Sequence, residues 1–183
     1  MNLSDEEIIK RSEEKKRELE EIFKHVSLAT NDATARVAIL GCGDKRFIKH
    51  HNQMFEELLR KPVELTTFDI SIEHLAGEEN VFQHDCTLPI PNPPYNITFA
   101  HVLLKFIETE KQWDLIKNSV DALKEGGLAI HVFDKEDYET KERLLSNGQF
   151  AVPLHRWEQE LQKLGFKFIE VYVKYGLALV VKK

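Results

Sequence analysis

The sequence contains little cysteine and no long apolar run, and both shortages restrict the kind of protein it encodes. Only two of its 183 residues are cysteine, Cys42 and Cys86, which is too few for the disulfide framework of a small secreted domain. No apolar stretch approaches the ~20 residues that a membrane-spanning helix needs. Residues 1–21 are charged throughout and lack the apolar core of a signal peptide. We therefore expect a cytoplasmic protein without a membrane anchor.

Basic residues are fewer than acidic ones. The chain has 25 Lys and Arg against 31 Asp and Glu, which gives a net charge of −6, and its pI is near 5.8. Non-specific binding to nucleic acid needs a basic surface that displaces counterions, and no dense Lys/Arg stripe is visible. A nucleic-acid partner is therefore disfavoured.

Metal ligands are scattered along the chain. A structural zinc site needs a third and a fourth ligand at suitable spacing, whereas His84 and Cys86 form only a close pair. His50 and His51 fall in a helical stretch, where neighbouring side chains face different directions. Ordinary residues at a strand end are the favoured interpretation of the pair, with a metal site as the alternative.

Regular alternation of apolar runs and helical periodicity indicates one α/β domain. Apolar runs predict strands at 36–40, 63–70, 80–85, 96–104 and 128–134, and a hairpin of two strands over 166–183. Helical spacing predicts helices at 44–61, 109–127 and 153–165. Strands that alternate with helices form a mostly parallel sheet with helices on both faces, and the C-terminal hairpin adds an antiparallel edge. The sequence thus predicts seven strands.

A charged helix precedes this domain. Ser4 and Glu7 form a capping-box pattern that starts a helix. Its apolar positions recur at helical spacing: Ile8, Leu19, Ile22 and Val26. Ser12 and Lys15 interrupt that stripe, so we expect a surface helix that docks weakly through its C-terminal half, with a lid over a ligand site as the alternative. We divide the chain into an N-terminal helical extension (1–33) and the α/β domain (34–183).

Three consecutive strand ends carry the groups that a nucleoside needs. Gly41 and Gly43 follow the first strand and allow a ligand to approach bare backbone. Asp69 ends the second strand and is suited to accept hydrogen bonds from a ribose diol. Asp85 ends the third and is suited to an adenine amino group. Since ligands bind at the carboxyl ends of parallel strands, the three ends together predict an adenosine site.

The glycine turn also argues against two nucleotide classes. A dinucleotide-binding loop has the pattern G-x-G-x-x-G, and its third glycine position is Arg46 in this chain. A phosphate-binding P-loop needs Gly-Lys-Ser/Thr, which is absent. A nicotinamide-dependent oxidoreductase is therefore disfavoured, and an ATP-hydrolysing P-loop protein is excluded.

The order of the motifs resembles the class I S-adenosylmethionine-dependent methyltransferases, particularly those that act on small molecules. "VAILGCG" is similar to their glycine-rich first motif, and "FDIS" to the acidic end of their second strand. "HDCTLPIPNPPYNITFAHVLLKFI" and "DALKEGGLAIHVF" resemble the segments around their third, fourth and fifth strands. "LQKLGFKFIEVYVKYGLALVVKK" resembles their closing helix and hairpin. The resemblance covers roughly residues 34–183 and implies a Rossmann-like fold with S-adenosylmethionine as cofactor and S-adenosylhomocysteine as product.

The resemblance also implies which residues bind the cofactor. They are Gly41, Cys42, Gly43, Asp69, Ile70, Asp85, Cys86, Ala100 and His101. The glycine turn would line the methionine part, Asp69 would hold the ribose hydroxyls, and Ile70 would pack on the adenine. Asp85 and Cys86 would meet the adenine edge. Ala100 and His101 would lie near the sulfonium.

Three positions depart from the pattern of the family. Ile39 stands where the family usually has an acidic residue, Lys45 where it often has a third glycine, and Asn96 where it usually has an aspartate. These changes keep an alternative open: a methyltransferase-like protein without catalysis that binds a cofactor or another protein.

Methyl transfer needs few catalytic groups, because the sulfonium is already activated and alignment supplies much of the rate. A base is needed only where the acceptor loses a proton. His101 and His131 are the candidate bases, with half-buried, hydrogen-bonded histidines as the alternative. Tyr138, Phe150 and Trp157 are candidate walls for a small-molecule acceptor, or packing residues. No feature of the sequence specifies an oligomeric state.

Overall fold

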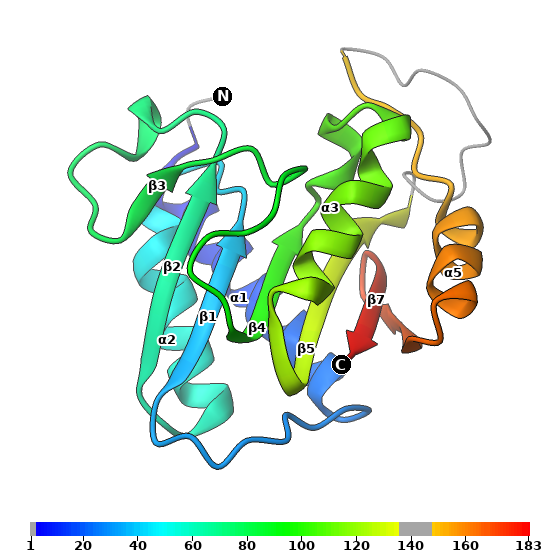
Figure 1. Cartoon of the computed structure of the whole chain (residues 1–183). Coiled ribbons are helices and arrows are strands. Elements are labelled where there is room, and N and C mark those ends of the chain that lie inside the picture. The colour runs from blue at the N-terminus through cyan, green and yellow to red at the C-terminus, as the bar shows by residue number, and fades with distance from the viewer. Residues whose placement is uncertain (1–2, 136–147) are drawn as a thin grey trace.

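The protein forms a seven-stranded sheet in the order β3-β2-β1-β4-β5-β7-β6 (Figure 1). The structure, a computed structural model, describes residues 3–135 and 148–183. The strands are β1 (Ala35–Leu40), β2 (Val63–Asp69), β3 (Val81–Gln83), β4 (Tyr95–His101), β5 (Leu123–Asp134), β6 (Lys167–Val173) and β7 (Gly176–Lys182). The helices described are α1 (Asp5–Phe23), α2 (Arg46–Leu59), α3 (Thr109–Asp121) and α5 (Leu154–Lys163), with the short 3₁₀ helices η1 (Glu73–Leu75) and η2 (Leu104–Phe106).

The pairing of the strands confirms the predicted topology. Strands β3, β2, β1, β4 and β5 pair in parallel, and β7 pairs antiparallel with both β5 and β6. The chain builds outward from β1 to β3 and then returns to place β4 on the other side of β1. The strand order therefore reverses between β1 and β4, and in open α/β sheets a ligand binds outside the carboxyl ends at such a point.

Helices cover both faces of the sheet, as expected, and each face has its own core. Side chains of β1 alternate between them: Val37 and Ile39 pack with α1 and α2, whereas Ala38 and Leu40 pack with α3 and α5. Figure 1 shows α3 in front of the sheet and α1 and α2 behind it. Each face of the sheet is therefore covered by its own layer of helices and its own buried core.

The N-terminal helix is docked along its length, so the expectation of weak docking through its C-terminal half is wrong. The capping box forms: Glu7 N donates to Ser4 Oγ at 3.2 Å, and Ser4 N donates to Glu7 Oε2 at 2.7 Å. Ile8 near the start of α1 is 2% exposed, and Leu19 and Ile22 near its end are fully buried. The helix packs against α2 and β6.

Two element boundaries differ from the prediction. Helix α3 ends at Asp121, and β5 begins at Leu123, although helical spacing suggested a helix to the glycine pair at 126–127. The pairing of β4 with β5 shifts register across this segment, so that Gly126, with φ of +79°, accommodates an irregularity inside a strand. The predicted strand at 96–104 is also shorter in the structure: β4 ends at His101, because the backbone of the next residue, Val102, has φ of +54° and leaves the extended conformation. Ile107 lies before the first residue of α3.

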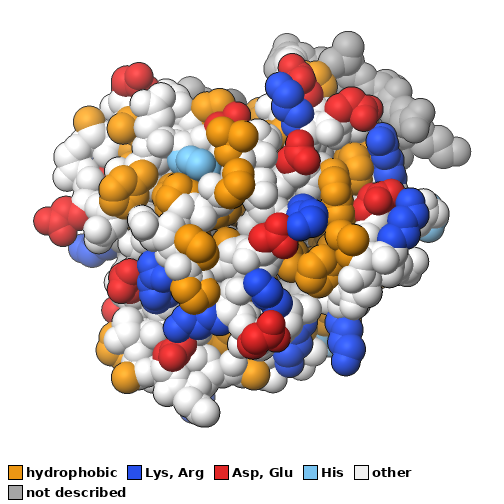
Figure 2. All heavy atoms as spheres, in the orientation of Figure 1, with side chains coloured by type: hydrophobic (Ala, Val, Ile, Leu, Met, Phe, Trp, Pro, Cys, Tyr) orange, Lys and Arg blue, Asp and Glu red, His pale blue; other side chains and the backbone are white. Residues whose placement is uncertain are grey.

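Charges of both signs occur on the face of the molecule that Figure 2 shows. On the face that carries α3 and α5, basic and acidic side chains are interspersed among the residues drawn in colour (Figure 2). None of the described helices is both long enough and apolar enough to cross a bilayer.

Candidate functional site

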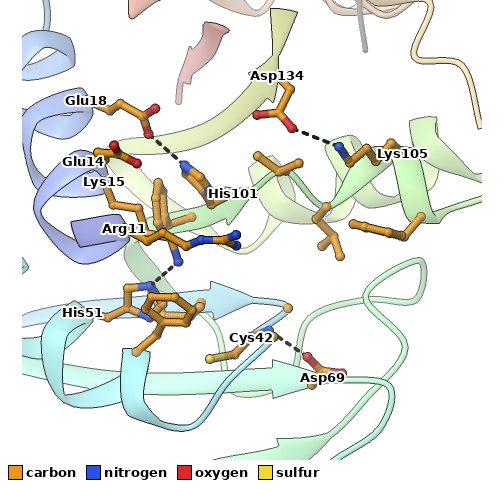
Figure 3. A pocket seen from close by; sticks show the side chains of 18 of the residues that line it. Arg11, Glu14, Lys15, Glu18, Cys42, His51, Asp69, His101, Lys105 and Asp134 are labelled. Carbon is orange, nitrogen blue, oxygen red and sulfur yellow. Dashed lines mark hydrogen bonds and ion pairs between the residues drawn. The ribbon is translucent and has the colours of Figure 1, made fainter. Parts of the chain in front are cut away.

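A cavity of about 970 Å³ lies at the carboxyl ends of β1, β2, β4 and β5. Its floor is the turn after β1 and the ends of β2 and β4, and one wall is α1 (Figure 3). Residues of α2, η2, the turn between β6 and β7, and the segment before α5 also line it. The volume falls at the upper end of the range for small-molecule sites. The position is the one that the reversal of strand order predicts.

The two glycines of the turn after β1 have different physical roles. Gly41 has φ of +79°, and a Cβ added there would lie 2.9 Å from Leu103 Cδ1. Gly43 has no positive φ, and a Cβ there would meet no atom within 4 Å. Both residues line the cavity. Gly41 is therefore required by the backbone, whereas Gly43 leaves open space beside the cavity.

Asp69 joins this turn to the end of β2. Its Oδ2 accepts a hydrogen bond from Cys42 N at 2.7 Å, and its Oδ1 accepts one from Ser71 N at 3.1 Å. Asp69 and Ile70 both line the cavity, and Ile70 is 68% exposed. The structure thus brings together the turn, one acidic strand end and an exposed apolar side chain, which are two of the three strand ends of the adenosine hypothesis and the residue next to Asp69. Asp69 keeps further lone pairs for a ligand, because each carboxylate oxygen carries two.

Asp85, Cys86 and Ala100 lie outside the lining of the cavity. Oδ1 of Asp85 accepts hydrogen bonds from Thr87 N at 2.9 Å and Thr87 Oγ1 at 2.7 Å, which lower the pKa of the Asp85 carboxyl. Cys86 is 8% exposed, and burial raises the pKa of its thiol to about 12. Ala100 points into the core under α3, opposite to the next residue of the strand.

Charged side chains of α1 reach the cavity, and sequence reasoning assigned no role to them. They are Lys10, Arg11, Glu14, Lys15 and Glu18. The sequence did carry one sign of this role: the polar residues that interrupt the apolar stripe of the helix include Lys15. This outcome supports the second interpretation of α1, a cover over a ligand site.

Lys15 is held among aromatic and imidazole groups. Its Nζ lies 3.3 Å from His51 Nε2 and 3.9 Å from the centroid of the Phe47 ring. Burial lowers the pKa of Lys15 to about 8, against the opposing charge of Glu18. Burial, with the nearby Lys15 charge, also lowers the pKa of His51 well below its ordinary value. The cavity thus places an amine of lowered basicity next to a neutral imidazole.

The turn after β1 also fixes α1 over the cavity. Arg46 Nη1 donates to Asp5 Oδ1 at 2.6 Å, and Arg46 Nη2 donates to the backbone oxygen of Leu3 at 2.9 Å. Arg46 also donates to Asp44 Oδ2 at 2.6 Å, and this contact lowers the pKa of Asp44 to about 2. The residue that stands at the third-glycine position therefore ties the start of α2 to the start of α1.

His101 is the one candidate base that lines the cavity. Its Nε2 lies 2.7 Å from Oε2 of Glu18, which comes from α1. Burial lowers the pKa of His101, and the carboxylate of Glu18 opposes that effect. Nearby, Lys105 Nζ donates to Asp134 Oδ2 at 2.9 Å across the opposite wall (Figure 3). The His101–Glu18 contact and the Lys105–Asp134 ion pair therefore border the same space.

His131, the other candidate base, lies outside the cavity. It is 1% exposed, and its Nε2 is 2.8 Å from Ser119 Oγ of α3. Burial lowers the pKa of His131 to about 4. A buried histidine on the α3 face has no access to a substrate, so the structural interpretation holds for His131.

Of the three expected substrate walls, the two that the structure describes, Phe150 and Trp157, lie outside the lining of the cavity. Trp157 is 2% exposed in the core under α3 and α5, where its Nε1 donates to Gln112 Oε1 at 3.1 Å. Phe150 lies outside the lining, although its neighbour Gln149 contributes to it. Tyr138 lies outside the described residues.

The three departures from the family pattern occupy different places. Ile39 lines the cavity and is 1% exposed. Lys45 lies outside the lining, with its Nζ 3.5 Å from the backbone oxygen of Ala76. Asn96 lies at the amino end of β4, where it donates to Asp32 Oδ2 at 2.9 Å and accepts from Arg36 N at 2.8 Å. Only Ile39 therefore bears on a ligand in the cavity.

Within residues 3–135 and 148–183, no three His, Cys, Asp or Glu side chains are grouped to hold a metal ion. Cys42 and Cys86 are both free thiols and both buried.

No family model matches the chain, and no curated protein matches it. Solved structures do match its fold. A S-adenosylmethionine-dependent methyltransferase from Clostridium acetobutylicum has a TM-score of 0.63 at 12% identity, with 92% of this chain and 91% of that chain covered. The glycopeptide N-methyltransferase MtfA, complexed with S-adenosylmethionine, has a TM-score of 0.63 at 12% identity, with 91% and 93% covered.

A third structure, LepI in complex with S-adenosylhomocysteine and a substrate analogue, has a TM-score of 0.61 at 13% identity. The match covers 88% of this chain and 46% of LepI, so the chain spans about half the length of that protein. At such identities the likeness concerns the path of the backbone. This chain has the fold of the class I S-adenosylmethionine-dependent methyltransferases.

Proposed function

We propose that this protein is a S-adenosylmethionine-dependent methyltransferase that acts on a small molecule. The observation that carries the proposal is the cavity, in which the turn of Gly41 and Gly43 meets the carboxylate of Asp69 at the reversal of strand order. In the proposed complex the methionine part lies along the turn and the ribose hydroxyls bind Asp69. Ile70 packs on the adenine. Asp85 and Cys86 receive no contact in this proposal, because neither lines the cavity.

The size and cover of the cavity support a small acceptor. A volume of about 970 Å³ accommodates an adenosine-containing cofactor with room for a second, compact molecule. Helix α1 closes one side, which limits the dimensions of an acceptor that reaches His101. Transfer is an in-line displacement at the methyl carbon, so the chief task of the protein is to align the acceptor with the sulfonium.

A second function has its own support. Ile39 lines the cavity at the position where the methyltransferase family usually has an acidic residue. A protein described as a pericyclic reaction enzyme shares the fold, with a TM-score of 0.59 at 14% identity. A protein that binds the cofactor without transferring its methyl group is therefore the alternative.

Calorimetric titration with S-adenosylhomocysteine, and separately with NADH, tests the proposal. The native chain is expected to bind S-adenosylhomocysteine, and Asp69→Asn to bind it at least about 10-fold more weakly, because the amide lacks the charge that favours a ribose hydroxyl. Asp114→Asn, on the exposed side of α3, is the matched control.

The outcomes separate the functions. Binding of S-adenosylhomocysteine with transfer of a labelled methyl group supports the methyltransferase. Binding without transfer supports the alternative. If the protein binds NADH and not S-adenosylhomocysteine, or binds neither ligand, the proposal is overturned.

A further inference from the structure

The side chains of His101 and Glu18 form a contact that joins two distant segments of the chain. His101 ends β4 and Glu18 belongs to α1, 83 residues earlier, yet Nε2 and Oε2 are 2.7 Å apart. Glu18 is 8% exposed, an unusual position for a carboxylate without a charged partner. Figure 3 shows the two side chains pointing toward one another at the edge of the cavity.

We propose that Glu18 positions His101 as a general base, so that the methyl acceptor of this protein reacts through a hydroxyl or an N–H group. The inference rests on the proposed function and names the acceptor chemistry of the same site. Acceptors that carry no proton at the reacting atom, such as a thioether or a tertiary amine, would leave the pair without a role.

The hydrogen bond to Glu18 fixes the form of the imidazole. A carboxylate accepts only, so Nε2 must carry the proton and Nδ1 is left with its lone pair. Nδ1 of His101 has no hydrogen-bond partner among the described residues. It is also not one of the fully buried polar atoms that lack a partner. His101 lines the cavity, so its basic nitrogen is available to a bound acceptor.

The charges around His101 favour the neutral ring near neutral pH. Burial and the Lys15 charge lower the pKa of His101, while Glu18 and, from the end of β5, Asp134 oppose them. His51 of α2 is the neighbouring imidazole, and its own pKa is lowered further. A neutral ring is ready to take a proton, and Glu18 stabilises the imidazolium that results.

A second opening provides a path for the proton. Glu18 lines the cavity and also a groove of about 400 Å³ between α1 and the β6–β7 hairpin. Glu14 and Tyr175 line both spaces as well, and Tyr172 at the far side of the groove is 73% exposed. The carboxylate therefore stands between the reacting centre and solvent.

The step balances as follows. The acceptor atom forms a bond to the methyl carbon, the carbon–sulfur bond breaks, and its electron pair returns to sulfur, which leaves S-adenosylhomocysteine. The acceptor proton passes to Nδ1 of His101. The proton on Nε2 is then released through Glu18 to the groove, which leaves His101 with its proton on Nδ1. Exchange with solvent moves that proton back to Nε2 and restores the starting tautomer.

Nitrogen-15 NMR of the imidazole tests the geometry without an acceptor. With S-adenosylhomocysteine bound, we expect His101 to carry its proton on Nε2, and Glu18→Gln to lower the His101 pKa because a negative charge is lost. The sulfonium of bound S-adenosylmethionine should lower that pKa as well, since a positive charge then faces Nδ1. A proton on Nδ1, or a His101 pKa that Glu18→Gln leaves unchanged, overturns the inference.

Methyl transfer tests the chemistry. S-adenosylmethionine with a carbon-13 methyl group is incubated with a protein-free extract of small molecules, and the labelled products are identified by NMR. His101→Gln, which keeps a donor toward Glu18, should slow labelling about 10²- to 10⁴-fold. Glu18→Gln should slow it about 10-fold and move the acid limb of the pH profile to lower pH. Glu20→Gln, an exposed position of α1, should change neither.

The outcomes distinguish this inference from the proposed function. A labelled methyl group on oxygen or on a nitrogen that lost a proton supports the base. A labelled methyl group on a thioether sulfur or a tertiary amine overturns the base and leaves the methyltransferase intact. A native protein that binds S-adenosylhomocysteine but labels nothing overturns both activity and base. Loss of S-adenosylhomocysteine binding in Glu18→Gln would indicate a structural role only.

Discussion

The two faces of the sheet differ in what their helices bring to the strands. On one face, α3 and α5 cover a core in which buried polar groups hydrogen-bond to one another, such as Gln112 with Trp157 and Ser119 with His131, although Nδ1 of His131 is left without a partner among the described residues. On the other face, α1 directs Lys15 and Glu18 toward a cavity. The same strands supply both faces. The difference therefore depends on the covering helices.

Neighbouring histidines show the consequence. His101 and His131 lie on adjacent paired strands, and both were equal candidates for a base. One meets a carboxylate at an open cavity, and the other meets a hydroxyl under α3. His131 pairs with Ala100 and not with His101, so the two imidazoles point to opposite faces of the sheet, and the helix that covers each face decides what each imidazole meets.

The largest effect on stability should come from truncating a side chain in the core under α3 and α5. Trp157→Ala is expected to lower the free energy of unfolding by about 4 kcal/mol, because it leaves a cavity among packed side chains and removes the partner of Gln112. Urea denaturation measures the change. Phe47→Ala, which removes a ring from the cavity wall, should cost about 2 kcal/mol, since its loss opens onto existing space. Equal costs would contradict the distinction between the faces.

A pH-dependent effect should follow from His131. Its pKa is about 4 in the folded chain and about 6.5 when unfolded, so the unfolded state binds more protons between these values. Stability should therefore fall as pH drops from about 6.5 toward about 4, by roughly 3 kcal/mol through this group. His131→Gln should flatten that part of the profile in denaturation series at several pH values. His155→Gln, at an exposed position of α5, should leave the profile unchanged.

The smallest effects should separate the two glycines of the turn. Gly41→Ala is expected to lower the free energy of unfolding by about 2 kcal/mol, because φ is +79° and the new Cβ would press on Leu103. Gly43→Ala should change stability by less than about 0.5 kcal/mol, since its Cβ enters open space. Calorimetry should nevertheless show weaker binding of S-adenosylhomocysteine by Gly43→Ala. Unchanged affinity would place the ligand elsewhere.

Much of the fold could be predicted from local patterns. A continuous apolar run marked β1, as expected for a strand buried on both faces, and segments rich in apolar and β-branched residues marked β2, β4 and β5. Helical periodicity located α2 and α5. The end of α3 was missed because the glycine pair after it resembles a helix stop, whereas Gly126 lies in an irregular strand pairing. That choice depends on β4, which no local pattern contains.

For the site, the sequence by itself determined the turn of Gly41 and Gly43 and the acidic end of β2. A parallel sheet must bring consecutive strand ends to one edge, so Asp69 had to meet that turn. Asp85 turns to Thr87 in a local contact between residues two positions apart. Only the tertiary structure decided that α1 closes the cavity with Lys15 and Glu18. The physical reason is distance along the chain: α1 docks through Arg46 and a buried apolar stripe, and contacts between such remote segments leave no periodic trace in the sequence.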